Sequence, residues 1–282
     1  MSRILTLQQH GIKLGTAGRL SSKNLPPERT SIGGWSAHAI RRNNDFLRSV
    51  DYDYLPTGFA FTGTVRDCPA TSDEWHRLLK LFFDRLTRTE GCVLIHWVIE
   101  WQRRGVPHVH CSLFFDNPPL DIQQRITAHW LALFGEYGAG RGGQHIQYIH
   151  GALGWAQYTS KHAQRGLGHY QRSPENVPAD WLGKTGRMWG KRGKWSVIEP
   201  MKMQIPDDVF YRFRRSLRSW RKADARASGC RFRIRSARRM LNCNDPKLSA
   251  VRGCSEWMQQ TIVSELLVYF AQYSRGEVIQ VG

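Results

Sequence analysis

Two histidines separated by one residue, His108 and His110, carry the clearest chemical signal in this sequence. Alternate side chains of a β-strand share one face, so the two imidazoles would project together. Glu100 lies in the preceding apolar run, and a hairpin between the two runs would bring its carboxylate to the same face. Two imidazoles and a carboxylate, with open coordination positions, suit a divalent metal ion. Asp67 and Asp116 are the alternative carboxylate ligands.

A tyrosine and a lysine three residues apart, Tyr158 and Lys161, form the second candidate pair. Residues at this spacing lie on one face of a helix. A nearby ammonium favours the phenolate, which is the nucleophilic form of tyrosine. The same spacing is common on the surfaces of amphipathic helices, so the pair is informative only in combination with the histidines.

The segments around these residues predict the elements that position them. Residues 92–102 and 107–115 are apolar and β-branched, and Arg103-Arg104-Gly105 between them is suited to a hairpin turn. A strand is predicted at 57–65. A helix is predicted at 71–88, because Thr71 and Glu74 form a capping box before apolar residues at helical spacing.

The order of the remaining elements predicts the fold class. A helix over 121–134, a glycine-rich loop over 135–143, a strand over 144–149 and a helix over 152–164 follow the hairpin. Strands this close in sequence, joined partly by a hairpin, favour a mainly antiparallel sheet with flanking helices. The predicted class is therefore α+β.

Composition indicates a polyanionic partner. The 282 residues include 41 Lys and Arg against 23 Asp and Glu, a formal net charge of +18. Such an excess favours nucleic acid, because neutralising phosphates releases counterions. Six cysteines without a paired framework predict reduced thiols, and neither a signal peptide nor a long apolar run is present. We therefore expect a cytoplasmic protein that does not enter a membrane.

Shifts in composition predict three regions. Residues 1–50 are rich in glycine and basic residues and are expected to form a partly ordered basic arm. Residues 51–200 contain the candidate site. Residues 201–282 are predicted to be a mostly helical basic region that binds DNA or mediates self-association.

Taken together, these motifs resemble the HUH single-strand endonucleases, and within them the single-tyrosine rolling-circle replication initiators of phages and plasmids. The match comprises the apolar strand ending in threonines at 59–64, Glu-x-Gln-x-x-Gly-x-Pro-His-x-His at 100–110 and Tyr-x-x-Lys at 158–161. The segment at 186–190 also resembles one that follows the nuclease core in phage initiators. The resemblance covers about residues 55–200.

This resemblance implies a fold, an activity and roles for the candidate residues. The fold would be the ferredoxin- or RRM-like core of HUH nucleases. His108, His110 and Glu100 would hold Mg²⁺ or Mn²⁺. Tyr158 would cut single-stranded DNA and form a 5′-phosphotyrosine, with Lys161 steadying the phosphate or the phenolate.

The expected partners are single-stranded DNA at a replication origin, with or without a hairpin, and a host helicase and polymerase. Self-association is left open. The predicted DNA contacts are basic residues of the hairpin turn, of the segment that follows the nuclease core and of the C-terminal region: Arg103, Arg104, Arg187, Lys191, Arg212, Arg214 and Arg215.

Other functions remain open from the sequence. A related transposase or relaxase would use the same metal motif, although the additional histidine of relaxases is replaced by Arg104. A cupin-type metal enzyme would require a carboxylate shortly after His110, where Cys-Ser-Leu-Phe-Phe follows instead. The third alternative is a nucleic-acid-binding protein without catalysis, whose histidines are incidental.

Overall fold

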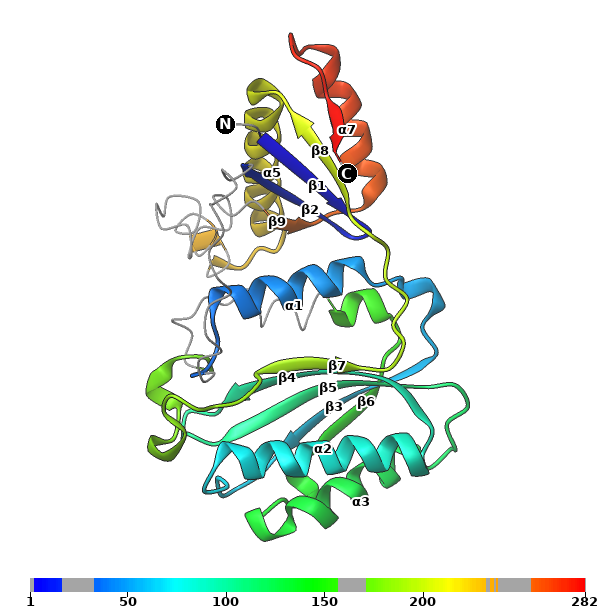
Figure 1. The fold of residues 1–282 in the computed structure, drawn as a ribbon, viewed down its shortest axis with the longest axis vertical. Helices are drawn as coiled ribbons and strands as arrows, with labels where there is room; N and C mark the ends of the chain where they lie inside the picture. Colours follow the sequence, from blue (N-terminus) through cyan, green and yellow to red (C-terminus); the bar gives the residue numbers. More distant parts are fainter. Residues whose placement is uncertain are drawn as a thin grey trace. The chain divides into compact units, whose positions relative to one another are not determined.

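The computed structural model describes residues 3–16, 33–156, 171–231, 234, 235, 237 and 255–281. The chain divides into two compact units. The central unit comprises residues 27–47 and 51–196, and the terminal unit comprises residues 1–26, 48–50 and 197–282. Each unit contains a five-stranded antiparallel sheet with helices packed on it (Figure 1). The predicted α+β class is confirmed.

The sheet of the central unit has the strand order β6-β3-β5-β4-β7, so the strand with the two histidines lies in its middle. All of its neighbouring strands are antiparallel. Its strands are β3 (Thr57–Thr64), β4 (Cys92–Trp101), β5 (Pro107–Phe115), β6 (His145–Tyr148) and β7 (Trp189–Arg192).

The hairpin between β4 and β5 forms as predicted. Its turn is closed by hydrogen bonds from the Gln102 N–H to the Val106 carbonyl (2.9 Å) and from the Gly105 N–H to the Gln102 carbonyl (3.0 Å). Gly105 has a φ of +75°, which glycine adopts without steric cost. The glycine of the turn therefore sets the register that places Glu100 opposite His108.

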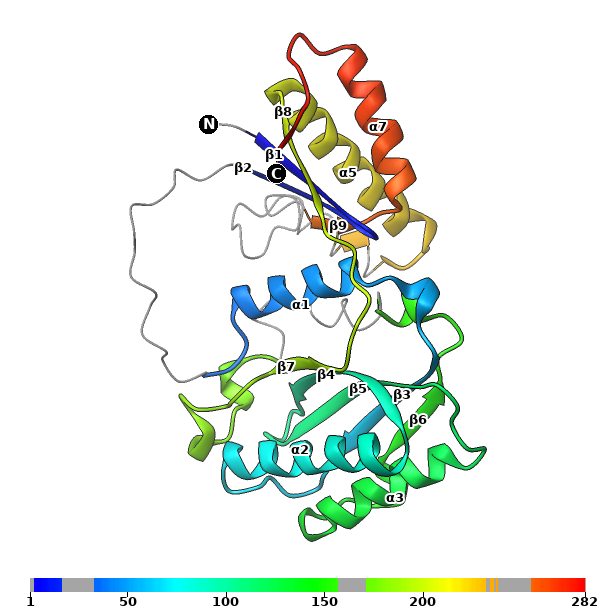
Figure 2. The ribbon, with the colours of Figure 1, turned by 45° about the vertical axis from the view of Figure 1, so that its right-hand side comes forward.

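Helices α2 (Ser72–Thr89) and α3 (Ile122–Phe134) cover one face of this sheet (Figures 1 and 2). Phe61 of β3 packs against Phe82 of α2 and Trp130 of α3, with ring centroids 5.5 Å apart in both pairs. A Cβ on Gly63 would lie 2.7 Å from the Trp130 ring, so the glycine of the Thr62-Gly63-Thr64 motif makes room for this core. The aromatic core holds the sheet from the side opposite the histidines.

The cap of α2 confirms half of the predicted capping box. Thr71 Oγ1 accepts a hydrogen bond from the Glu74 N–H at 3.2 Å. The Glu74 carboxylate pairs instead with Arg77, at 2.7 Å, and accepts a bond from the Tyr137 hydroxyl at 3.4 Å. The charge of Arg77 one turn ahead attracts the carboxylate away from the cap.

Helix α1 (Ala37–Ser49) lies over the other face of the same sheet, the face that carries the histidines (Figure 2). Its Asn43 Oδ1 is 2.8 Å from Nε2 of His96 on β4, and its Phe46 ring packs against Trp195. The helix thus buries the end of this face beyond the candidate site. Short 3₁₀ turns complete the unit, at Tyr52–Tyr54, Gly135–Tyr137, Arg141–Gly143, Pro174–Asn176 and Ala179–Trp181.

The terminal unit corrects the expectation of an N-terminal arm for the described residues 3–16. Leu5, Leu7, Ile12 and Leu14 alternate along two strands and are buried. The apolar residues that cover them come from the other end of the chain, which a local pattern cannot reveal. Residues 17–32 of the predicted arm lie outside the described part.

The described residues of the C-terminal region contain the expected helices and, in addition, three strands. The sheet order is β10-β8-β1-β2-β9, and the two helices lie side by side against it (Figure 2). The elements are β1 (Arg3–Gln8), β2 (Gly11–Thr16), β8 (Met201–Ile205), α5 (Asp207–Ala227), β9 (Ser255–Trp257), α7 (Gln260–Gln272) and β10 (Ile279–Val281).

Two further expectations concern the cysteines and membrane-spanning helices. Cys68, Cys92, Cys111 and Cys230, the cysteines within the described residues, are free thiols, and burial raises the pKa of Cys92 to about 12. Within the same part of the chain, no helix has both the length and the apolar character required to cross a membrane.

Candidate metal centre

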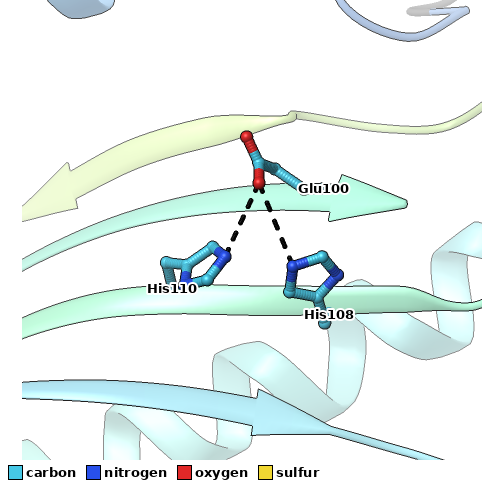
Figure 3. Close-up of side chains that lie close together, drawn as sticks. All are labelled: Glu100, His108 and His110. Carbon is cyan, nitrogen blue, oxygen red and sulfur yellow. Dashed lines mark ion pairs between the residues drawn. The ribbon is translucent and has the colours of Figure 1, made fainter. Parts of the chain in front are cut away.

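Glu100, His108 and His110 meet on the face of the sheet covered by α1 (Figure 3). Glu100 on β4 is directly opposite His108 on β5, and His110 follows two residues along. The Glu100 Oε2 atom is 3.9 Å from His108 Nε2 and 3.6 Å from His110 Nε2. One ligating atom from each side chain lies within 4.8 Å of the other two. The triad predicted from strand alternation is therefore assembled.

Thr62 of β3 orients one of the two imidazoles. Its Oγ1 is 3.0 Å from Nδ1 of His110, which lies opposite it in the sheet. The tautomer that carries its proton on Nδ1 donates to Thr62 and leaves the Nε2 lone pair facing Glu100 Oε2. A hydrogen bond at the far nitrogen is the usual way in which proteins orient a metal-binding histidine.

Arg172 is a site residue that the sequence did not reveal. Its guanidinium Nη2 is 3.3 Å from Glu100 Oε1, and both side chains are completely buried. Glu100 thus presents one oxygen to Arg172 and the other to the two histidines. No local pattern marks Arg172, which is 72 residues from Glu100 and one arginine among many.

The surroundings of Arg172 hold it against β4. Its guanidinium lies 4.4 Å from the centre of the Trp35 ring, a cation–π contact. Trp35 Nε1 donates to the carbonyl of Ile99 at 2.9 Å, and the Trp101 N–H donates to the carbonyl of Gln171 at 2.8 Å. Hydrogen bonds on both sides of Glu100 therefore fix the carboxylate and its arginine relative to the strand.

The charges and donor atoms of this cluster suit a divalent cation. The Glu100 carboxylate balances the buried Arg172 cation, and the two imidazoles are uncharged in their ligating form. When two ligand atoms each lie about 2.1 Å from an ion and subtend an angle of about 90–110° at it, the distance between the two ligand atoms is about 3–3.5 Å. The observed separations of 3.6 and 3.9 Å are close to these values. Two nitrogens and one oxygen, with coordination positions left open, could hold a divalent metal ion.

A pocket adjoins His110 on the β6 side of the site. Its lining is rich in imidazole, amide and aromatic groups, from Thr62, His110, His145, Gln147, Tyr148, Ile149, His150, Gly151, Gly154 and Trp155. Tyr148 is 44% exposed, and its ring packs against His150 with centroids 4.8 Å apart. Flat rings beside a metal centre can stack on bases.

The helix predicted from residue 152 begins as expected, and residues 152–156 are helical. Trp155 Nε1 donates to Ser112 Oγ at 2.7 Å, and Ser112 is two residues beyond His110 on the same face of β5. This start of the helix therefore lies on the metal-binding face. Tyr158 and Lys161 lie outside the described residues.

The basic residues predicted to contact DNA have different surroundings. Arg103 and Arg187 are exposed. Arg104 donates to the carbonyls of Val65 (2.6 Å) and Arg66 (2.8 Å), so it holds the hairpin turn. Lys191 Nζ lies 4.4 Å from the centre of the Phe46 ring.

The alternative carboxylates do not join the metal-binding group. Asp67 pairs with Arg66 at 3.0 Å, and Asp116 is exposed. Among the described residues, the group of side chains able to share an ion is Glu100, His108 and His110.

Comparison with known proteins gives matches over most of the chain. The family model for the replication-associated protein ORF2 matches residues 59–164, a segment that contains the triad and Tyr158. The replication-associated protein of Pseudomonas phage Pf3 is 47% identical over 271 residues, which cover 95% of this chain and 96% of that protein. A provisionally named replication protein of Xylella fastidiosa strain 9a5c is 45% identical over 262 residues, 90% and 92% of the two chains. No solved structure matches the chain.

These relatives bear out the resemblance to phage and plasmid replication proteins that the ordered motifs predicted. The similarity extends through both units rather than being confined to the metal-binding motif. The chain therefore belongs to the ORF2 family of replication-associated proteins.

Proposed function

We propose that this protein initiates rolling-circle replication by cutting and rejoining single-stranded DNA through a covalent tyrosine intermediate. The observation that carries the proposal is the convergence of Glu100, His108 and His110 in a protein of a replication-associated family. Residues 152–156 form the start of a helix on the same face of the sheet, and Tyr158 follows two residues later in the sequence, which supports a nucleophile near this centre.

The metal centre would act on the scissile phosphate. A divalent ion held by Glu100, His108 and His110 would neutralise the non-bridging oxygens and help to align the phosphorus for attack. Arg172 and Thr62 keep the ligands in place, Arg172 through Glu100 Oε1 and Thr62 through His110 Nδ1. Either Mg²⁺ or Mn²⁺ should serve, with tighter binding of Mn²⁺ because two ligands are imidazoles.

Tyr158 would be the nucleophile of this reaction. Its phenolic oxygen, after losing its proton, forms a bond to phosphorus, and the bond from phosphorus to the 3′ oxygen breaks. The 3′ oxygen takes up a proton and leaves as a free hydroxyl, while the 5′ phosphate stays on the tyrosine. Lys161, three residues further along the sequence, would stabilise the phenolate or the phosphate. The phosphotyrosine conserves the energy of the bond, so the reverse reaction can rejoin the ends.

The DNA strand would approach the metal centre across the exposed residues and the pocket that surround it. The pocket beside His110 is open to a base next to the scissile phosphate, and Arg103 and Arg187 are exposed for contacts to flanking phosphates. We assign the nuclease activity to residues 51–200, and the host helicase and polymerase would extend the free 3′ end. The bacterial cytoplasm is the expected location, since a phage replication protein is a close relative.

The direct test is covalent capture. A labelled single-stranded oligonucleotide carrying the element's own origin is incubated with the protein and Mn²⁺, and adducts that resist denaturant are sought. We expect an adduct with the wild type and none with Tyr158→Phe or with EDTA. An adduct that persists in Tyr158→Phe would assign the attack to another residue. Intact DNA binding without any adduct would favour a binding protein without catalysis.

A further inference from the structure

Helix α5 of the terminal unit has one buried face and one solvent-exposed face. Val209, Phe210, Phe213 and Leu217 are buried against the sheet and α7. The helix also carries seven Lys and Arg residues against three Asp. An amphipathic helix with this composition must present its charges on the opposite face.

Five residues form a row along that outer face, which we call the basic stripe: Tyr211, Arg215, Arg218, Lys222 and Arg226. Their spacings of four, three, four and four residues keep them on one side of the helix. Tyr211 is 41% exposed, Arg215, Arg218 and Arg226 are exposed, and Lys222 is half-buried. At 1.5 Å per residue the stripe is about 22 Å long.

The charges of the stripe are not compensated within the described part of the protein. No ion pair or side-chain hydrogen bond between described residues involves Arg215, Arg218 or Arg226. Cations one turn apart on a helix repel each other and destabilise it. A row of them without partners among the described residues therefore favours an external polyanion.

Two other arginines of α5 that are expected to contact DNA do not belong to the stripe. Arg212 lies 6.0 Å from the centre of the Tyr273 ring, and Arg214 lies at the same distance from Tyr211. Both are half-buried. Of the three arginines predicted in this helix, Arg215 is the one within the stripe.

We propose that the basic stripe of α5 binds the backbone of double-stranded DNA, so that the terminal unit holds duplex while the central unit acts on a single strand. The major groove admits an α-helix, and a duplex presents rigid, regularly spaced phosphates to a straight row of cations. Surfaces for single strands rely on several aromatic rings for stacking, whereas the stripe has only Tyr211. This assignment rests on the proposed action on DNA but uses a surface outside the metal centre.

The test compares two charge-matched triple variants of the full chain. R215Q/R218Q/R226Q removes three cations from the stripe, and K80Q/R85Q/R88Q removes three exposed cations from α2. Glutamine retains good helix propensity, and circular dichroism melting checks that both variants fold. Binding is measured by fluorescence anisotropy on a labelled duplex of about 30 base pairs, roughly three turns, across a salt series.

The stripe variant should bind the duplex about 10- to 100-fold more weakly near 0.1 M salt, with a slope of log K against log salt that is shallower by about 2 to 3. The control variant should retain the slope of the wild type. The proposal would be overturned if both variants lost the same amount of duplex affinity, or if the wild-type protein did not bind duplex DNA. A loss that is as large on a single strand of the same length would overturn the assignment to duplex.

The same preparations separate this inference from the nuclease proposal. Mn²⁺-dependent adduct formation on a pre-formed single strand should fall no further in the stripe variant than in the charge-matched control, because both lose three cations. Failure of adduct formation in every protein, with stripe-dependent duplex binding intact, would refute the nuclease alone. If adducts form normally but duplex binding does not depend on the stripe, only the proposal for the basic stripe is refuted.

Discussion

The two units of this protein use the same architecture and place their charges in opposite ways. Each has a five-stranded antiparallel sheet with two helices packed on one face. In the central unit Glu100, His108 and Arg172 are buried and converge within a few ångströms. In the terminal unit three arginines of α5, Arg215, Arg218 and Arg226, lie exposed in a row.

This difference separates two kinds of function on similar scaffolds. Burying charges is costly, so a buried group persists only when its members compensate one another or bind an ion. Such a buried cluster is suited to catalysis at a single reacting atom of a substrate. An exposed row costs little and suits an extended polyanion, whose contacts are many and individually weak. Variants that change one unit at a time test this division of functions, since each should alter the function assigned to that unit alone.

The largest effect is expected from the metal ligands. Replacing His108 or His110 by Ala should slow adduct formation by about 10³-fold, because a bound metal contributes several kcal/mol of transition-state stabilisation. Mn²⁺ titration by calorimetry should show the loss of binding directly. His129→Ala, which removes a half-buried imidazole 2.8 Å from the Glu90 carboxylate, is the control. Duplex binding should not change in any of these variants, and its parallel loss would contradict the division of labour.

The second effect concerns the buried charge pair. Arg172→Gln leaves the Glu100 carboxylate buried without its cation, so the free energy of unfolding should fall by about 3 kcal/mol without metal. Mn²⁺ should restore part of the loss by compensating the same carboxylate. The matched control is Arg192→Gln, whose pair with Asp84 is partly exposed and should be worth less than about 1 kcal/mol. Urea unfolding with and without Mn²⁺ measures both, and equal losses in the two variants would contradict the role of Arg172.

A smaller effect is expected at the hydrogen bond that orients His110. Thr62→Val keeps the shape of the side chain and removes Oγ1, so Mn²⁺ affinity should fall by about tenfold. The measurement is again calorimetric titration with Mn²⁺. Unchanged affinity would show that packing alone orients the imidazole.

The last effect, which is absent at neutral pH, is a pH dependence of stability from His96. Burial, with a smaller contribution from Lys191, lowers the pKa of this imidazole to about 3, whereas the unfolded chain has a value near 6.5. The unfolded state therefore binds a proton first as the pH falls, and stability is lost by at most about 1.4 kcal/mol per pH unit between about pH 6.5 and 3. His96→Gln should flatten this part of the profile in urea unfolding. An identical slope in the variant would assign it to other groups.

Local patterns predicted the centre of the central unit well. The hairpin, the capped helix α2 and the helix over 122–134 depend on nearby residues, and their bounds in the structure are close to those expected. The triad was predictable for the same reason, because strand alternation and a short turn determine which side chains of a hairpin share a face.

The terminal unit shows where such patterns fail. The β1–β2 hairpin was interpreted as an arm because nothing near it in sequence completes a core. Its partners are β8 and the helices that follow residue 206, about 200 residues away. Sheet pairing over that separation depends on burial of both partners and leaves no periodic signal in either one alone.

The chemical identity of the site follows from the sequence: two histidines in alternation, a carboxylate across a tight hairpin, and a basic chain for an anionic partner. The tertiary structure supplied what holds that site, namely Arg172 beside Glu100 and Thr62 beside His110. It also decided which arginines of α5 face outward. The physical reason is the distance along the sequence over which each interaction acts. Backbone geometry relates residues that are neighbours along a strand or helix, whereas a buried ion pair between residues 72 positions apart forms only when the whole fold is packed.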